Sequence, residues 1–135
     1  MLEVFILGTA GYMPLRDRFL SSCALRAKGE ALLIDAGEGT QLAYRACGLS
    51  MKKIGAVLLT HCHADHTAGL PGLLLTMGNE GRRERVDVYG PAGTRRLVDA
   101  VRAIAQEIPF ELKVTEWPDG GGEEQICGLA VTAFP

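Results

Sequence analysis

The six consecutive residues HCHADH, at positions 61–66, constrain this chain more than any other part of its sequence. They contain all three histidines of the chain together with one aspartate. The apolar run of residues 54–60 precedes them and is typical of a buried strand. Imidazole and carboxylate groups are common ligands of zinc and similar divalent transition metals. The sequence therefore predicts a metal centre where this strand ends.

The spacing of these ligands indicates two ions rather than one. Side chains two residues apart in an extended strand point to the same side, so His61 and His63 can bind one ion together. Asp65 and His66 follow as the chain bends into a helix, and they can face a second ion. Two metals roughly 3.5–4 Å apart are a recurrent arrangement in hydrolases. Cys62 points away from its neighbours, and we expect it to be a small buried residue rather than a ligand.

The segment THCHADH, residues 60–66, resembles the HxHxDH signature of the metallo-β-lactamase superfamily. Other segments narrow this to the N-terminal half of ribonuclease Z, the transfer-RNA 3′-processing endonuclease family, which they resemble in order: FILGTAG (5–11), LIDAGEGTQ (33–41), GLPGL (69–73) and VYGP (88–91). The resemblance covers essentially the whole chain. HxHxDH alone specifies only the superfamily, and the other segments indicate the ribonuclease Z branch.

The resemblance implies a role for each matching residue. His61 and His63 would bind the first zinc ion, and Asp65 and His66 the second. Asp65 would also accept a proton from the activated water. Asp35 would orient a ligating imidazole through its free ring N–H, the alternative being an acid at the N-terminus of the following helix. The implied cofactors are two Zn²⁺ ions, with Mn²⁺ or Fe as alternatives, only partly occupied in this chain alone.

The implied fold class is α/β, a metallo-β-lactamase-like αββα sandwich in which two αβ halves pack sheet against sheet. This chain would supply the N-terminal αβ half, a mixed sheet with helices on one face, as one continuous unit over residues 1–135. The inner face of the sheet then needs a cover, because helices alone cannot bury all of the apolar strand residues: Val4, Ile6, Leu33 and Val57.

Hydrophobic patterning predicts the element order β-β-β-α-β-α-β-α-β-β. Strands are expected at residues 2–8, 22–28, 31–36 and 54–60, with a hairpin turn at Gly29-Glu30. Helical periodicity is expected over residues 42–46, over about 67–77, and across Leu97, Val101, Ile104 and Ile108. A glycine-rich loop at residues 120–122 precedes the final pair of strands.

One loop departs from the ribonuclease Z pattern. Members of that family tend to carry Pro-x-Lys-x-Arg-Asn after the first strand, whereas this chain has PLRDRF at residues 14–19. The function that the resemblance implies is a zinc-dependent phosphodiesterase that acts on transfer-RNA precursors. Two alternatives stay open: hydrolysis of a small-molecule ester, sulfate or cyclic phosphodiester, and a non-catalytic half-domain that needs a partner.

The family pattern places further histidines and a bridging aspartate beyond Pro135. We therefore expect this chain to be the N-terminal half of a longer protein, or a truncated or cleaved product of one. Its partners would be RNA or a small phosphodiester substrate. The apolar inner face predicts either a homo-oligomer or association with the missing C-terminal half.

Composition adds the expectation of a cytoplasmic protein without membrane association. No run approaches the ~20 apolar residues of a membrane span, and the N-terminus has no basic leader. The four cysteines are scattered without a CxxC pair, which is typical of reduced thiols. The net charge of −2 provides no basic field for RNA. We expect the arginines at 82, 83 and 85 to lie in a solvated loop rather than in a phosphate site.

Overall fold

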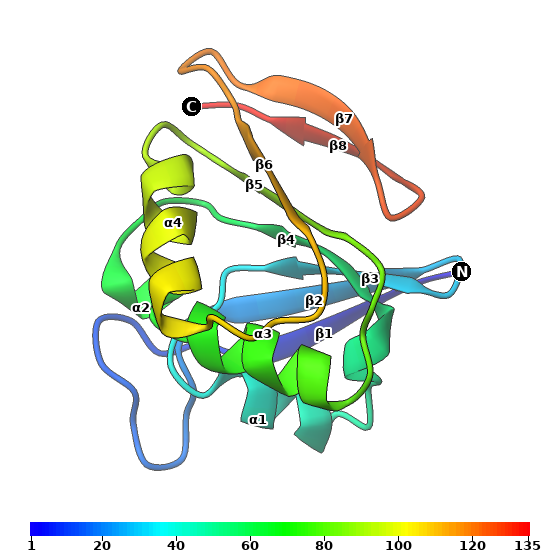
Figure 1. The fold of residues 1–135 in the computed structure, drawn as a ribbon, viewed down its shortest axis with the longest axis vertical. Coiled ribbons are helices and arrows are strands. Elements are labelled where there is room, and N and C mark those ends of the chain that lie inside the picture. The colour runs from blue at the N-terminus through cyan, green and yellow to red at the C-terminus, as the bar shows by residue number, and fades with distance from the viewer.

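A computed structural model describes residues 1–135 (Figure 1). The strands are β1 (Leu2–Gly8), β2 (Ser22–Ala27), β3 (Glu30–Ile34), β4 (Ile54–Leu58), β5 (Val86–Gly90), β6 (Leu112–Glu116), β7 (Gly122–Ile126) and β8 (Leu129–Ala133). The α-helices are α1 (Thr40–Ala46), α2 (Ala64–Thr67), α3 (Leu70–Asn79) and α4 (Thr94–Ile104), and a 3₁₀ turn, η1, spans Met51–Lys53. No helix combines the length and the apolar character that crossing a bilayer requires.

A mixed sheet contains the first six strands in the order β1-β2-β3-β4-β5-β6. The pairs β1–β2 and β2–β3 are antiparallel, and the pairs from β3 to β6 are parallel. Parallel neighbours need crossover connections, and the helices provide them. Because β3, β4 and β5 run in the same direction, their carboxyl ends meet at one edge, where Ile34 pairs with Leu58 and Leu58 with Tyr89.

The main helices cover one face of this sheet and form the larger core with it (Figure 1). Leu33 and Val57 are fully buried in that core. The prediction that they would need a cover other than the helices is therefore wrong. The strands β3 and β4 carry apolar side chains on both faces. The alternation of side chains along a strand therefore does not show which face the helices cover and which is the inner face.

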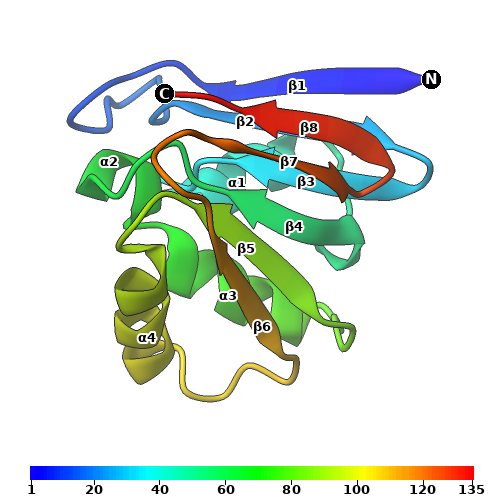
Figure 2. The ribbon, with the colours of Figure 1, turned by 90° about the horizontal axis from the view of Figure 1, so that it is seen from above.

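The hairpin β7–β8 lies across the opposite face of the sheet (Figures 1 and 2). Its Ile126 is buried in a second, smaller core with Leu32, Ala56 and Tyr89. The Trp117 ring stacks near Tyr89, with ring centroids 5.6 Å apart. The chain therefore covers part of its own inner face.

Strand β1 keeps an exposed apolar stripe on the side away from the helices. Leu2, Val4 and Ile6 are 52%, 57% and 63% exposed, whereas Phe5 and Leu7, which alternate with them, pack on the main core. Val4 and Ile6 thus lie without a cover, as the sequence predicted for them. A half-sandwich with an uncovered inner face accounts for this stripe.

Several element boundaries differ from the prediction. The β2–β3 turn lies at Lys28 and Gly29, whose φ angles of 50° and 83° suit a two-residue hairpin, so Glu30 already belongs to β3. Strand β6 was not predicted, and Ile108 lies beyond the end of α4. The helix expected over about 67–77 is two helices, broken before α3 at Gly69.

Gly69 breaks that helix because its backbone packs directly on the loop after β3. Its N–H donates to the Ala36 carbonyl at 2.9 Å. A Cβ at this position would lie 1.9 Å from the carbonyl oxygen of Gly37. Only glycine permits such an approach, and the contact brings the loop after β3 against the start of the predicted metal site.

The first arginine of the segment that contains Arg82, Arg83 and Arg85 is buried and hydrogen-bonded rather than solvated. Arg82 is only 7% exposed, and its Nη1 and Nη2 donate to the carbonyls of Lys52 and Arg85 at 2.6 and 2.7 Å. Arg85 pairs with Asp87 at 2.7 Å. The prediction is therefore wrong for Arg82, whose guanidinium joins the segment to η1.

Candidate metal centre

The three histidines lie at the edge where the carboxyl ends of β3, β4 and β5 meet. Strand β4 ends at Leu58, so His61 and His63 stand on the loop that follows it rather than on the strand itself. His63 is the extended residue at the start of α2. The two rings are still neighbours, with centroids 4.7 Å apart in an edge-on arrangement. The short helix α2 then carries Asp65 and His66.

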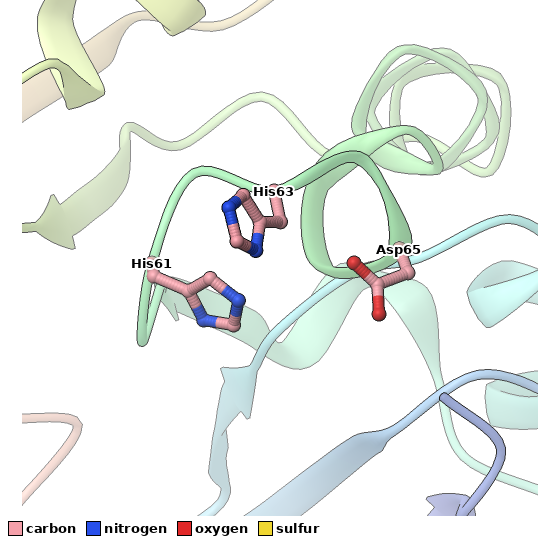
Figure 3. A group of neighbouring side chains, drawn as sticks. All are labelled: His61, His63 and Asp65. Atoms are coloured by element: carbon pink, nitrogen blue, oxygen red, sulfur yellow. The ribbon is translucent and has the colours of Figure 1, made fainter. Parts of the chain in front are cut away.

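His61, His63 and Asp65 form a compact group (Figure 3). One potential ligand atom from each residue lies within 4.8 Å of the others. His61 and Asp65 are half-buried, and His63 is exposed. Figure 3 shows both imidazole rings and the carboxylate directed toward a shared space.

His66 stands beside this group. Its ring centroid is 4.1 Å from that of His61, and its Nε2 is 3.4 Å from Oδ2 of Asp65. The sequence paired Asp65 with His66, and the structure brings the Asp65 carboxylate close to that ring as well as to His61 and His63. The Asp65 carboxylate therefore lies near all three histidines.

Asp35 is a buried carboxylate that forms hydrogen bonds with other residues of the site. It is 5% exposed and has a left-handed backbone, with φ of 60°. Its Oδ1 accepts the Thr60 main-chain N–H at 2.8 Å, and its Oδ2 lies 2.7 Å from the Thr60 hydroxyl and 2.8 Å from Nδ1 of His66. The first turn of α1 contains no acid, so the alternative of a helix N-terminal role for Asp35 is wrong.

The loop between β1 and β2 reaches the site through its backbone. The N–H of Tyr12 donates to Oδ2 of Asp65 at 2.9 Å. This hydrogen bond is the main cause of a lowered pKa of the Asp65 carboxyl, and the nearby charges of His66 and His61 act in the same direction. Sequence reasoning missed Tyr12, because a main-chain donor leaves no signal in residue type.

Close backbone packing holds the elements of the site together. A Cβ at Gly37 would lie 2.2 Å from the carbonyl oxygen of Asp65. Gly37 belongs to the DAGEGTQ segment, and this contact explains why a residue without a side chain is needed at that position. Cys62 takes no part in the group: its Sγ is 4.0 Å from Oγ1 of Thr94, on another element.

The donor set fits a divalent transition metal. The group offers two imidazole nitrogens and one carboxylate oxygen within a few ångströms of one another. Catalytic zinc sites use such ligands and leave one coordination position of the ion open for water or substrate. The hydrogen-bond network behind the rings is also typical of metal sites, in which a carboxylate fixes the ligating imidazole. The fold and site together define a protein of the metallo-β-lactamase fold with a candidate His/Asp metal centre.

Comparisons with known proteins agree with this class. Ribonuclease Z of Agathobacter rectalis is 48% identical over 134 residues, which are 99% of this chain and 44% of that protein. The crystal structure of human tRNase Z, short form, superposes with a TM-score of 0.79 at 35% identity, covering 87% of this chain and 45% of the other. The metallo-beta-lactamase fold protein YhfI from Bacillus subtilis superposes with a TM-score of 0.68 at 20% identity, covering 90% and 48%.

A family model described as "Anti-Pycsar protein Apyc1" matches residues 2–99, and the chain belongs to that family. The predicted resemblance to the N-terminal half of ribonuclease Z and the predicted fold class are both confirmed. The chain spans less than half the length of the ribonuclease Z relative that it matches.

Proposed function

We propose that this chain is the N-terminal, metal-binding half of a hydrolase that cleaves phosphodiester bonds in transfer-RNA precursors. The observation that carries the proposal is the compact His61, His63 and Asp65 group, in a chain 48% identical to a ribonuclease Z over 99% of its length. Metal-assisted hydrolysis is the chemistry for which such a group is suited.

The proposed cofactor is zinc, in two ions for the complete protein. His61 and His63 would hold the first ion, and Asp65 with His66 the second, with Mn²⁺ or Fe as alternatives. The closeness of Asp65 to all three histidines supports a carboxylate that both ions can share. This chain alone offers half of the ligand set that the ribonuclease Z resemblance implies, so we expect partial occupancy.

Bound zinc would supply Lewis acidity that lowers the pKa of water and stabilises negative charge on a phosphoryl group. Asp65 would accept the proton of the attacking water as the bond from phosphorus to the leaving oxygen breaks. The lowered pKa of Asp65 means that this carboxylate is ionised at neutral pH, and it also makes the carboxylate a weaker base than an ordinary aspartate. The Tyr12 N–H would hold its Oδ2 in place during that step.

The loop that carries Tyr12 would contact the substrate. Its tip is a tight turn in which Leu15 and Arg18 exchange main-chain hydrogen bonds of 3.0 and 3.3 Å. Arg16 and Arg18 on this tip are exposed, and arginine is well suited to bind phosphate. These side chains could hold an RNA backbone next to the candidate metal centre.

A second candidate is hydrolysis of a small phosphodiester, a cyclic one included, or of another small ester or sulfate. Two observations favour keeping it: the match to a family described as anti-Pycsar, and the arginine and phenylalanine that replace lysine and asparagine of the ribonuclease Z pattern at residues 16 and 19. The third candidate is a non-catalytic half-domain completed by a partner.

The exposed stripe on β1 supports a partner for the inner face. We propose that this face packs either on the C-terminal half that the longer relatives possess or on a second copy of this chain. The four cysteines are free, which supports the cytoplasm as the compartment.

One experiment separates these functions. The zinc-loaded chain, alone and mixed with the C-terminal half of the Agathobacter rectalis relative, is assayed on a precursor transfer RNA and on bis-p-nitrophenyl phosphate, with Asp65→Asn as the inactive control. Cleavage on the 3′ side of the acceptor stem by the mixture supports the first proposal. Hydrolysis of the small ester alone favours the second, and no hydrolysis of either in any mixture leaves only the third.

A further inference from the structure

The Thr60 hydroxyl lies between a buried carboxylate and a candidate metal ligand. Its Oγ1 is 2.7 Å from Oδ2 of Asp35 and 3.0 Å from Nδ1 of His61. The Thr60 main-chain N–H also donates to Oδ1 of Asp35, so the residue is held at two points. A hydroxyl has one proton and can donate it to only one of its two neighbours. The direction of that donation decides which nitrogen of His61 carries hydrogen.

The distances determine the direction. An ionised carboxylate only accepts hydrogen bonds. Two oxygens 2.7 Å apart therefore need the hydroxyl proton between them, and Thr60 donates to Asp35. Its oxygen then presents a lone pair to His61, whose Nδ1 must carry the hydrogen that completes the 3.0 Å contact. The Nε2 of His61 is left with a free lone pair, and Figure 3 shows this ring directed toward the space that it shares with His63 and Asp65.

The same carboxylate acts directly on a second histidine. Nδ1 of His66 lies 2.8 Å from Oδ2 of Asp35, so it also donates hydrogen and leaves its Nε2 free. That Nε2 is the atom that faces Asp65. Asp35 is therefore connected to two histidines, one by direct contact and one through Thr60.

We propose that Thr60 is a positioning residue. Its hydroxyl donates to Asp35 and accepts from Nδ1–H of His61, and this relay fixes the Nδ1–H tautomer of His61. One buried carboxylate thereby presets the Nε2 lone pairs of His61 and His66 for metal binding. The role of this relay in metal binding rests on the proposed metal centre. The tautomer of His61 is a property of the metal-free chain and can be measured in that chain.

The first test is long-range ¹H–¹⁵N NMR of the histidine rings in metal-free protein at about pH 8.5, above the usual histidine titration range. In the wild type, both His61 and His66 should carry hydrogen on Nδ1. In Thr60→Val, which removes the hydroxyl and keeps the shape, His61 should move toward the Nε2–H tautomer while His66 is unchanged. His66 serves as the internal control, because its contact with Asp35 does not pass through Thr60.

The second test is zinc affinity by competition with a chelator dye. Thr60→Val should bind zinc about 10–100-fold more weakly, as is usual when an outer hydrogen-bond partner of a ligating histidine is lost. Thr60→Ser keeps the hydroxyl and should stay close to the wild type. Equal affinity of the valine variant and the wild type, or a serine variant as weak as the valine variant, would overturn the relay.

The wild-type spectrum alone already decides the central claim, should Thr60→Val fail to fold. An Nε2–H tautomer of His61 in the wild type shows that no relay exists. A wild type with the Nδ1–H tautomer that binds no zinc overturns the metal centre and the purpose of the relay, while the relay itself stands. The two failures are therefore distinguishable.

Discussion

The main-chain N–H of Tyr12 donates a 2.9 Å hydrogen bond to Oδ2 of Asp65, 53 residues further along the chain. Tyr12 adopts a left-handed backbone with φ of 66° to make this contact. The loop between β1 and β2 is therefore joined to the candidate metal centre by its backbone. Changes of side chain in that loop can leave the hydrogen bond to Asp65 in place, because its donor is a main-chain group.

Removal of one candidate ligand should weaken metal binding without unfolding the chain. We expect His63→Ala to lower zinc affinity by about tenfold or more, or at least about 1.4 kcal/mol, because only three ligand atoms form the compact group. His63 is exposed, so the circular dichroism spectrum and the unfolding midpoint should change little. Isothermal titration calorimetry measures the affinity.

The matched control for this prediction is Cys62→Ser, in the residue between the two histidines. The Cys62 thiol contacts Thr94 and is not in the metal group. Its substitution should leave zinc affinity at the wild-type value. Equal zinc affinity of His63→Ala and the wild type would contradict the assignment of His63.

Loss of the Asp35 carboxylate should destabilise the fold. Asp35→Ala leaves the Thr60 N–H, the Thr60 hydroxyl and His66 Nδ1 without their acceptor, and it places alanine in a left-handed conformation. We expect the free energy of unfolding in urea to fall by about 2–4 kcal/mol.

Asp35→Asn is the conservative comparison. Asparagine tolerates the left-handed backbone and keeps one acceptor oxygen, so the loss should be about 1–2 kcal/mol. If alanine and asparagine destabilise the chain equally, the hydrogen bonds to Asp35 do not contribute as argued.

The stripe on β1 should make the chain self-associate when it is alone. Leu2, Val4 and Ile6 expose a contiguous apolar surface, and such surfaces drive association. Light scattering coupled to size exclusion at micromolar concentration should give a mass above that of one chain. The double variant Val4→Thr and Ile6→Thr, which keeps strand propensity, should shift the mass to that of a monomer.

Ile104→Thr is the control for the stripe. Ile104 is also exposed, at 69%, but lies at the end of α4 on the helix side. Its substitution should leave the mass unchanged. A wild-type chain that is a stable, monodisperse monomer would show that the β7–β8 hairpin already covers enough of the inner face.

Cys127 should resist alkylation although it is a free thiol. Burial raises its pKa to about 11, with a further contribution from the charge of Glu30. Its Sγ also donates to the Ala31 carbonyl at 3.5 Å. At pH 8 only about one thiol in a thousand would be ionised, and the thiolate is the reactive form. Iodoacetamide followed by peptide mass spectrometry should therefore label the exposed Cys47 long before Cys127. Equal labelling rates would contradict the half-buried position of Cys127 in the turn between β7 and β8.

The sequence by itself determined where the candidate site lies and which side chains compose it. The four residues His61, His63, Asp65 and His66 are nearly contiguous, so they belong to one short segment in any fold, and α2 with the loop before it turns their side chains toward one another. It also determined the hairpin of β2 and β3 and the main helices, because apolar periodicity and turn residues are local properties.

Only the tertiary structure decided how the parts meet. Apolar strands buried on both faces do not reveal which side the helices cover, so Leu33 and Val57 were assigned to the wrong face. The hydrogen bonds of Asp35 with Thr60 and His66, and of the Tyr12 N–H with Asp65, connect residues 25, 31 and 53 positions apart. Such contacts depend on strand order and on close backbone packing at glycines, which arise when the whole chain folds and which no local pattern specifies.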